Sequence, residues 1–535
     1  MPAGSDVSPA RFETTLRTVG LLVGPSAAIA VYLAHPGGLE PPGRRLLAIL
    51  ALTVVYWMTE AIPLPATALL ASALAILSGV APARDVFQPY ADPVIFLFVG
   101  SFLLAEAFRK YGLDRRVADL VVARSDAARN PGRLLWSVGG ATAFVSCWLS
   151  NTATAALMTP MALGIADAPP AAPAAPPGSR SGRPGWLATG LLLLVAYAAS
   201  VGGMMTLVGT PPNLLTAGYI ERLTGVKISF AAWLVFGVPL GGILLIVSIV
   251  AVRIAGRLRE RAATRSQAIL DAPSAAPARV PDGGRAGLEA VADESHEPEP
   301  AFREPDPRLR AQGARLTIAA FVLAGALWTL PALLTLCLGA DAPATKRLSA
   351  VLPEAAVALL CAALLFVAPL DWRRRRFALT WAEGRRVDWG ILLLFGGGLS
   401  LGTLAESTGV ARVVGGWLSG LGLARTESGF LLCAIALTIL VSEFASNTAS
   451  ASLLVPLVIA TAEASGFEPV RPALAVGMAA TCGFMFPVSS PPNAIVYGTG
   501  RVPLTAMIPL GAFLDVVAIV TLWVGFLLLA PWLPR

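Results

Sequence analysis

The chain has little charge, few histidines and no clustered cysteines. Only 14% of its 535 residues are charged, 56% are hydrophobic, and the mean hydropathy is +0.70. His35 and His296 are the only histidines, which argues against an imidazole metal site or a Ser-His-Asp triad. The five cysteines stand singly in apolar segments, so they form neither a metal-binding pattern nor a disulfide framework. The high apolar content is instead typical of a protein that is embedded in a lipid bilayer.

Further absences narrow the function. The sequence has no GxxxxGK loop for phosphate, no nucleophile paired with a base and no metal-ligand cluster, so neither an ATP-driven pump nor an enzyme is expected. The net charge is +7, but no zinc-finger or RNP signature accompanies it. We therefore assign the basic residues to cytoplasmic loops of a membrane protein, and expect no nucleic-acid partner. Residues 1–17 lack the pattern of a cleavable signal.

Long apolar runs are what the chain does have. Each run of roughly 18 residues or more can cross a bilayer as a helix, which predicts an all-α, polytopic membrane protein surrounded by lipid. The candidate spans are 18–34, 46–60, 63–82, 93–108, 186–222 (broken), 229–252, 316–337, 351–370, 389–406, 471–500 (broken) and 508–531.

Three further segments interrupt this pattern. Residues 134–166 and 429–463 are apolar but carry Ser-Asn-Thr in the middle. Because each arm is short for a full crossing, we expect two re-entrant helical hairpins. Residues 253–314 contain ten acidic residues and ten arginines without apolar periodicity, which predicts a cytoplasmic linker, mostly disordered over 268–312. The Ala/Pro tract 167–184 is expected to be a second loop of this kind.

The chain repeats itself. At an offset of 296, residues 146–160 match 442–456 at eight of fifteen positions, and Asp92 and Gly100 match Asp388 and Gly396. At an offset of 280, the Pro-Pro-Asn that begins at Pro211 matches the one that begins at Pro491. Each half therefore contains one Ser-Asn-Thr break followed by one Pro-Pro-Asn break.

Loop charges predict that the two halves are inverted. In the first half, the loop 83–92 has one basic residue and the loop 109–133 has seven. In the second half, the loop 371–388 has six arginines and the loop 407–428 has two. Basic residues mark the cytoplasmic side, so equivalent loops lie on opposite faces, as in an inverted-topology repeat. This places the N-terminus and the linker in the cytoplasm and the C-terminus outside, with the bacterial inner membrane as the expected location.

The repeated breaks predict ion sites. Two prolines in an apolar span free backbone groups that protein, water or an ion must satisfy, and half-helix ends suit ions. Residues four apart, such as Ser146 with Ser150 or Ser442 with Ser446, are expected to share a helix face. Neutral oxygen ligands of this kind suit sodium rather than calcium. The predicted ligands are Ser146, Ser150, Asn151 and Gly209 for sodium site 1, and Ser442, Ser446, Asn447 and Ser489 for sodium site 2.

Charge predicts that the cations are coupled to an anion. No Lys or Arg occurs in 134–179 or 426–470, so a dianion at the hairpins needs co-bound cations, and linkage makes that dependence reciprocal. Glu60, Glu106, Glu443 and Asp515 are the acidic residues nearest the apolar spans. Glu443 has no counterpart in the first half, where Cys147 stands, so a symmetric proton-coupling pair is not expected. Its role is left open between direct involvement and a structural hydrogen bond. The run of three glycines that begins at Gly396 is interpreted as a helix-packing feature.

Taken together, these motifs resemble one family. The paired Ser-Asn-Thr and Pro-Pro-Asn motifs, the stretch from Thr59 to Pro63 and the run from Asp388 to Gly398 are similar to those of divalent anion/sodium symporters, in particular their bacterial dicarboxylate transporter branch. The resemblance covers roughly 44–531 without the linker. It implies a homodimer, about eleven transmembrane helices with two re-entrant hairpins, and elevator-type movement of a transport domain against a scaffold.

The resemblance also implies a division of the chain and a substrate site. The segments are 1–91 (tail and scaffold helices), 92–228 (first transport segment with hairpin 134–166), 229–252 (scaffold or interface helix), 253–314 (linker), 315–387 (second scaffold helices), 388–507 (second transport segment with hairpin 429–463) and 508–535 (C-terminal helix). The implied substrate residues are Ser150, Asn151, Thr152, Thr210, Pro211, Ser446, Asn447, Thr448, Ser490 and Pro491. Ser489 and Ser490 depart from the Ala-Thr of many relatives.

The expected function is sodium-coupled symport of small dicarboxylates such as succinate, malate or fumarate. Alternatives on the same scaffold are a dicarboxylate exchanger, or a sodium-coupled transporter of citrate or sulfate.

Overall fold

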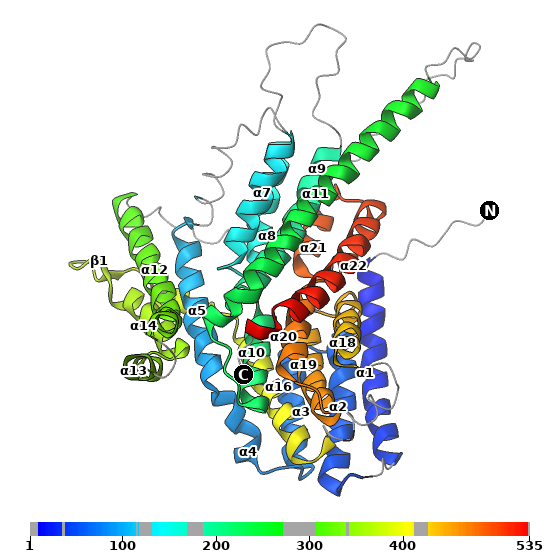
Figure 1. Cartoon of the computed structure of the whole chain (residues 1–535), viewed down its shortest axis with the longest axis vertical. Helices are drawn as coiled ribbons and strands as arrows, with labels where there is room; N and C mark the ends of the chain where they lie inside the picture. The colour runs from blue at the N-terminus through cyan, green and yellow to red at the C-terminus, as the bar shows by residue number, and fades with distance from the viewer. Residues whose placement is uncertain are drawn as a thin grey trace.

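The protein is described here by a computed structural model, which covers residues 9–34, 38–113, 116, 131–167, 186–270, 307–338, 342–410, 413 and 426–532. Helices dominate it (Figure 1). The first half contains α1 (Pro9–Leu33), α2 (Pro41–Thr59), α3 (Leu64–Leu77), α4 (Ala83–Phe87), α5 (Pro93–Lys110), α7 (Pro131–Ser146), α8 (Asn151–Asp167), α9 (Trp186–Met205), α10 (Pro211–Thr224) and α11 (Phe230–Leu270).

The second half follows the same plan. It contains α12 (Pro307–Leu338), α13 (Pro343–Val351), α14 (Glu354–Val367), α15 (Trp381–Gly384), α16 (Trp389–Ser407), α18 (Glu427–Ser442), α19 (Asn447–Ala464), α20 (Val470–Ala479), α21 (Pro491–Gly498) and α22 (Leu504–Leu528). The interrupted segments are therefore helix pairs: α7 with α8 and α18 with α19 at the Ser-Asn-Thr motifs, α9 with α10 and α20 with α21 at the Pro-Pro-Asn motifs.

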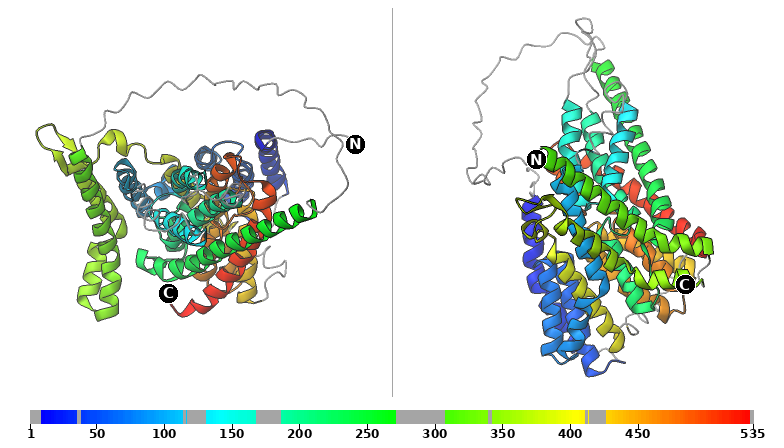
Figure 2. Two further views of the ribbon diagram at one scale, coloured as in Figure 1. Left: turned by 90° about the horizontal axis from the view of Figure 1, so that it is seen from above. Right: turned by 90° about the vertical axis from the view of Figure 1, so that its left-hand side faces the viewer.

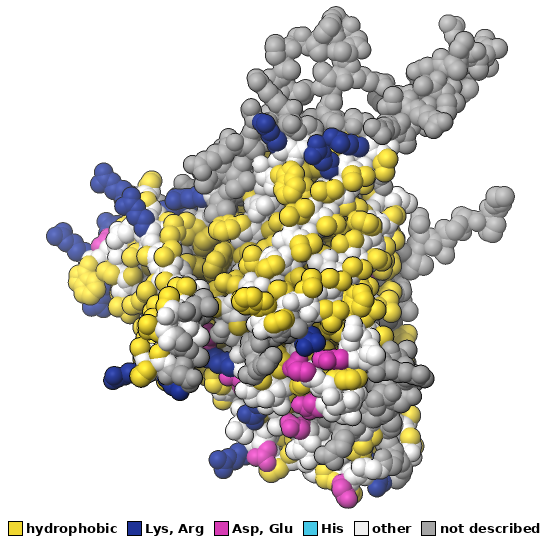
Figure 3. All heavy atoms as spheres, in the orientation of Figure 1, with side chains coloured by type: hydrophobic (Ala, Val, Ile, Leu, Met, Phe, Trp, Pro, Cys, Tyr) yellow, Lys and Arg dark blue, Asp and Glu magenta, His cyan; other side chains and the backbone are white. Residues whose placement is uncertain are grey.

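Length and composition agree with a membrane protein. Among the described residues, seven helices are long and apolar enough to cross a membrane, and one of them is α19. The face in Figure 3 shows apolar side chains in a band across the middle of the molecule, with charged side chains above and below it. This distribution fits a hydrocarbon layer bounded by two aqueous phases. The hairpin arms α7 and α8 have 16 and 17 residues, and whether either hairpin turns back within the membrane remains a prediction.

Repeated residues have identifiable local roles. The Asp92 carboxylate caps α5 by accepting from the Val94 amide at 2.9 Å, and Asp388 caps α16 by accepting from the Ile391 amide at 3.2 Å. A side chain that satisfies a free amide defines where a helix begins. The interpretation of the glycine run as a packing feature is confirmed, because a Cβ at Gly396 would come within 2.4 Å of the Tyr90 ring. The repeat thus preserves helix starts and close helix contacts as well as candidate ligands.

The predicted linker bounds are corrected by the structure. The linker was expected to begin at 253 and end at 314, but α11 continues to Leu270 and α12 already begins at Pro307. The added residues are rich in Ala, Arg and Leu, which are strong helix formers and need no apolar face to extend an existing helix. The all-α class is confirmed, and the one strand pair among the described residues is short: β1 (Pro369–Asp371) pairs antiparallel with β2 (Arg376–Phe377). The remaining linker residues, the tract 168–184 and most of the loops 109–133 and 407–428 lie outside the described residues.

Helices of the two halves pack against each other at the centre. The hairpin α7–α8 packs on α9 of its own half, and α8 also packs on α21 of the other half. The hairpin α18–α19 packs on α20, and α19 also packs on α10. Viewed from above, α7 and α8 lie near the middle of the bundle while α12 stands at one side (Figure 2). Each hairpin therefore meets the broken helices of both halves.

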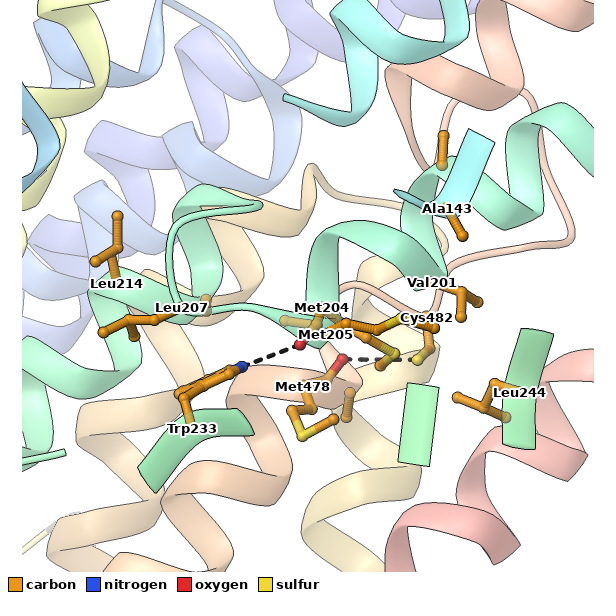
Figure 4. Packing of buried hydrophobic residues seen from close by; sticks show 14 of the residues in the cluster. Ala143, Val201, Met204, Met205, Leu207, Leu214, Trp233, Leu244, Met478 and Cys482 are labelled. Carbon is orange, nitrogen blue, oxygen red and sulfur yellow. Dashed lines mark hydrogen bonds between the residues drawn. The ribbon is translucent and has the colours of Figure 1, made fainter. Parts of the chain in front are cut away.

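The broken helices form the buried centre. The apolar window of α9 is 89% buried, whereas that of α12 is 24% buried, so α9 is surrounded by protein and α12 is not. Figure 4 shows Met204 and Met205 at the end of α9 close to Met478 and Cys482 of the other half. The Trp233 indole of α11 donates to the Met204 carbonyl at 3.0 Å and satisfies one of the carbonyls freed there.

One contact outside the spans relates the two basic loops. Lys110, at the end of α5, forms an ion pair of 2.8 Å with Glu383 of α15 and also donates to the Ala378 carbonyl. Burial opposes ionisation of Glu383, but the bonds from Lys110 and Thr380 outweigh it and hold the pKa of this carboxyl below its ordinary value. The beginning of the loop 109–133 therefore adjoins the loop 371–388, which supports the predicted inversion.

Candidate substrate and cation site

The Ser-Asn-Thr motifs form the tips of the two hairpins. The Ser150 hydroxyl accepts from the Ala153 amide at 3.3 Å, and the Ser446 hydroxyl accepts from the Ala449 amide at 3.2 Å. Each motif serine is thus positioned as the N-cap of the second arm, α8 or α19. The tips consequently present two helix N-termini, which favour anions.

This geometry corrects one prediction. Ser146 and Ser150 were expected to share a helix face, as were Ser442 and Ser446, but α7 ends at Ser146 and α18 ends at Ser442. The residue four positions later lies beyond the turn, where a capping serine takes an extended backbone, as Ser446 does with φ −63° and ψ 145°. The serines of each pair flank a turn instead.

Sodium site 1 brings a buried hydroxyl and an amide oxygen together. The Ser146 hydroxyl lies 3.0 Å from Asn151 Oδ1 and 2.6 Å from the Ala199 carbonyl of α9. A Cβ at Gly209 would lie 3.0 Å from the Ser146 carbonyl, so the backbone of the first break passes directly beside the tip. Ser150 is exposed and only caps α8 in this conformation. Ser146, Asn151 and Gly209 are therefore together, and Ser150 is at the edge.

Sodium site 2 repeats this arrangement. The Ser442 hydroxyl lies 3.1 Å from the Asn447 side-chain amide and 2.7 Å from the Ala480 carbonyl. The Ser489 hydroxyl donates within the second break, to the Phe486 carbonyl at 2.7 Å and the Gly483 carbonyl at 3.0 Å. Ser442, Asn447 and Ser489 are buried, whereas Ser446 is half-buried and caps α19.

The Asn447 amide connects the second hairpin tip to the second break. Its nitrogen is placed to donate to three oxygens, the Ser442 hydroxyl at 3.1 Å and the carbonyls of Ala480 and Ser489 at 3.1 and 3.2 Å. The hydroxyl and carbonyl oxygens gathered here are neutral ligands of the kind that suits sodium rather than calcium.

The asparagine of each Pro-Pro-Asn motif stabilises the break. Asn213 donates to the carbonyls of Gly203 and Thr206, at 2.9 and 2.7 Å. Asn493 donates to the carbonyls of Gly483 and Phe486, at 3.2 and 3.0 Å. These bonds satisfy carbonyls that the interrupted helix leaves free. Sequence reasoning did not assign this role.

Two glycines were also missed. Gly203 and Gly483 are equivalent at the offset of 280, so the repeat itself carried the signal. A Cβ at Gly203 would lie 2.0 Å from Asn151 Oδ1, and a Cβ at Gly483 would lie 3.1 Å from the Ser442 carbonyl. Both glycines allow the hairpin tip to approach the broken helix, and the approach is closer in the first half.

The predicted substrate residues lie at the same breaks. Thr152 is exposed and Thr448 half-buried, while Thr210 and Ser490 are buried. Pro211 and Pro491 begin α10 and α21, where a missing amide costs nothing. Because α8 packs on α21 and α19 packs on α10, each Ser-Asn-Thr helix adjoins the Pro-Pro-Asn helix of the other half.

A cavity of about 510 Å³ reaches Thr448. It is also lined by Arg17 of α1, by Glu60 at the end of α2 and by Asp388. Arg17 and Glu60 are 3.7 Å apart and both are about half exposed. The hairpins 134–166 and 429–463 contain no basic residue, and α1 brings Arg17 to this cavity. No sequence signal linked Arg17 to Thr448, because the two are brought together only by the fold.

Glu443 has a definite structural role. It is fully buried, and its carboxylate accepts the amides of Phe484, Met485 and Phe486 at 2.6, 2.9 and 3.1 Å. Two interpretations of Glu443 were left open, direct involvement and a structural hydrogen bond. The structure contains the structural hydrogen bond, which three amides donate. At the equivalent position, the Cys147 thiol makes only a 3.4 Å contact with the Gly202 carbonyl.

Comparison with known proteins gives consistent results. A sequence profile described as citrate transporter matches residues 54–470 and 344–534. An uncharacterised transporter of Haemophilus influenzae is 31% identical over 90% of this chain and 91% of its own length. A sodium-dependent dicarboxylate transporter of Staphylococcus saprophyticus is 29% identical over 96% and 91%. The solved structure of MtrF from Neisseria gonorrhoeae covers 92% of this chain and 96% of its own, with 14% identity and a TM-score of 0.52, and it supports the fold alone.

Proposed function

Since this chain belongs to the citrate transporter family, we propose that it carries small dicarboxylates across the membrane together with sodium ions. The matched tips carry this proposal: a serine hydroxyl lies 3.0 Å from the side-chain amide of Asn151 in one half and 3.1 Å from the side-chain amide of Asn447 in the other. The two relatives named above support it, one as a transporter and one as a sodium-dependent dicarboxylate transporter.

Family membership and fold make the chain a multi-pass membrane transporter and not an enzyme, as predicted. The resemblance to divalent anion/sodium symporters is also confirmed.

The proposed division of labour follows the geometry. Ser146, Asn151 and Gly209, with Ser150, hold one sodium ion, and Ser442, Asn447 and Ser489, with Ser446, hold the other. The substrate carboxylates contact the two Ser-Asn-Thr motifs, with Thr210, Pro211, Ser490 and Pro491 beside them.

Electrostatics explains the coupling. A dianion at the tips meets two helix N-termini, each worth about half a positive charge, so bound sodium provides much of the remaining countercharge. The anion then binds well only to the sodium-loaded protein, and by linkage it strengthens sodium binding equally.

The transport movement and assembly are proposed by family resemblance. They comprise a homodimer in the inner membrane, with a cytoplasmic N-terminus, a periplasmic C-terminus and a transport domain that moves as an elevator against a scaffold. The proximity of Lys110 to Glu383 supports this orientation, because it joins two loops that are both rich in basic residues.

Uptake into proteoliposomes tests the proposal. Labelled succinate is expected to enter when sodium is outside and to stay near background when choline replaces sodium. Equal uptake in the two buffers would contradict sodium coupling. Counterflow that persists without sodium would instead establish a dicarboxylate exchanger.

Citrate is the second candidate substrate, because the matched profile is described as citrate transporter. Competition separates the substrates: unlabelled succinate, malate and fumarate are expected to inhibit succinate uptake at lower concentrations than citrate or sulfate. Stronger inhibition by citrate or sulfate would reassign the substrate while leaving sodium coupling intact.

A further inference from the structure

Basic and aromatic side chains gather beyond the end of α14, on the loop 371–388. This loop contains six arginines and three acidic residues. All six arginines are exposed, and so are Trp372 and Trp381, at 75% and 66% of their surface. Figure 3 shows dark-blue side chains at the left edge of the molecule, where Figure 1 places β1. Tryptophans that are exposed beside arginines are typical of a surface that contacts the interface of a bilayer.

The loop is fixed to the helices around it. The Ala378 amide donates to the Ala368 carbonyl, directly after α14, at 3.0 Å. Lys110 of α5 donates to the Ala378 carbonyl at 2.9 Å. The Trp381 ring contacts the ring of Phe366 in the last turn of α14, with the ring centroids 6.3 Å apart. The arginines and tryptophans of the loop therefore have a defined place at the end of α14.

The helix that leads to this loop presents an apolar stripe. One side of α14 packs on α5 and α12. Its exposed residues recur at the spacing of a single helix face, and all of them are apolar: Ala356, Leu360, Ala363, Leu364 and Val367. Along the chain, the exposed surface thus changes from apolar side chains to tryptophan and arginine. Acyl chains, interface and headgroup follow one another in the same order in a phospholipid.

The acidic residues of the loop are already engaged. Asp371 lies 3.8 Å from Arg374. Glu383 is paired with Lys110, and Asp388 caps α16. Within the part of the chain that the structure describes, the other five arginines of the loop have no carboxylate partner. Their guanidinium groups can therefore bind an anion from outside the protein.

We propose that the loop 371–388 binds the headgroup of an anionic phospholipid whose acyl chains lie along the exposed stripe of α14. Guanidinium groups bind phosphate by two parallel hydrogen bonds, and a cluster of about four to eight basic residues next to a membrane-embedded helix is typical of anionic-lipid binding. The bound lipid holds the end of α14 at the membrane surface and, through Lys110 and Glu383, the end of α5 with it. This site is separate from the hairpin tips, and its existence does not depend on the proposed substrate or coupling ion.

Native mass spectrometry of the purified full-length protein tests this site without measuring transport. The protein in detergent receives phosphatidylglycerol and phosphatidylcholine with the same acyl chains at equal concentrations, and the bound lipids are counted. The wild type is expected to prefer phosphatidylglycerol by at least about tenfold, because each basic residue near the headgroup favours the anionic lipid by about fivefold. The double variant Arg373→Gln, Arg376→Gln is expected to lower this preference by at least about fivefold on the same basis. Arg374 stays in place because it pairs with Asp371.

The matched control is the double variant Lys346→Gln, Arg347→Gln. These two exposed basic residues lie on α13, next to the other end of α14, so the control removes the same charge and should keep the wild-type preference. A wild type without preference, or an equal loss in the two double variants, would overturn the proposal. Displacement of phosphatidylglycerol by excess glycerol 3-phosphate would also overturn it, because the site would then bind a soluble phosphate and not a lipid.

Quenching in nanodiscs gives a second measurement that needs no change to the arginines. Brominated phosphatidylglycerol is expected to quench more tryptophan emission in the wild type than in Trp372→Phe, since Trp372 lies at the level of the lipid. Equal quenching in the two proteins would place Trp372 away from the bilayer and overturn the proposal.

Discussion

The two hairpin tips share an oxygen scaffold but differ in what holds the break beside them. Asn213 follows Gly203 by ten positions, as Asn493 follows Gly483, so the two breaks have the same chain length. In the first half, α9 remains helical to Met205, whereas in the second half α20 ends at Ala479. The non-helical segment of the second break is therefore longer, although the two breaks contain the same number of residues.

Glu443 explains this difference. It accepts the amides of Phe484, Met485 and Phe486, which in a continuing helix would bond carbonyls four residues earlier. The Cys147 thiol at the equivalent place cannot accept three amides, so the first break keeps its helical turn. A repeat can thus preserve the ligands of two sites and still support each in a different way.

The largest effect is expected from replacing the asparagine that the two tips share. Asn151→Ala and Asn447→Ala are each expected to abolish sodium-dependent succinate uptake, since each deletes a buried amide that contacts a serine hydroxyl at one tip. Loss of such a contact costs about 1–3 kcal/mol in binding, or roughly fivefold to 150-fold in affinity. Uptake assays in proteoliposomes at matched protein density measure it.

Repeat-matched controls are available one turn away. Thr142 and Thr438 are equivalent, and each donates to a carbonyl of its own helix at 2.7 Å. Thr142→Val and Thr438→Val should leave uptake near the wild-type level. Near-normal transport in either asparagine variant would contradict a site built from both tips.

The second prediction concerns Glu443, the residue that distinguishes the second tip from the first. Glu443→Cys gives the second tip the residue of the first, and leaves three buried amides without their acceptor. We expect it to lower the free energy of unfolding by at least about 3 kcal/mol, because each unsatisfied buried donor costs about 1–3 kcal/mol. Thermal and denaturant unfolding of the purified protein measure the loss. Cys147→Ala is the control at the equivalent position and should change stability by less than about 1 kcal/mol. Equal losses at the two positions would refute the asymmetry.

The repeat could be recognised in the sequence because its motifs act on residues only a few positions away along the chain. Ser-Asn-Thr and Pro-Pro-Asn each determine where a helix starts, and Asp92 and Asp388 cap helices by bonds to residues two or three positions ahead. Contacts of this range leave motifs at fixed spacing, so the breaks and the tip asparagines could be predicted.

Long-range contacts left no such motif. Glu443 bonds amides about 40 residues away, and Gly511 of the last helix packs against the same segment. Arg17 reaches the cavity at Thr448 from α1. Glu443 could be named as an acidic residue in an apolar segment, but its bonds depend on how the second hairpin packs on the loop after α20. The predicted linker boundaries were wrong for a local reason. Ala and Arg extend a helix without an apolar pattern, so the sequence did not show where α11 ends.

A third prediction concerns how closely each tip approaches its break. In Gly203→Ala, the added Cβ would lie 2.0 Å from Asn151 Oδ1, so the amide has to move. In Gly483→Ala, the nearest atoms are at 3.1 Å and a small shift accommodates the methyl group. We expect Gly203→Ala to raise the sodium concentration for half-maximal uptake about tenfold, equal to about 1.4 kcal/mol, and Gly483→Ala to raise it by about twofold. A larger effect at Gly483 would reverse the order of the two tips.

The smallest expected effect concerns a charge beside the cavity that reaches the second tip. Arg17 lines the cavity that reaches Thr448, where it attracts an entering dianion, and Glu60 beside it opposes that attraction. Because both side chains are about half exposed, each contributes only a few tenths of a kcal/mol and is screened by salt. Arg17→Gln is expected to raise the KM for succinate about twofold, and Glu60→Gln to lower it slightly, with both changes shrinking as choline chloride is added. Opposite signs distinguish steering by charge from damage to the end of α2, which would raise the KM in both variants.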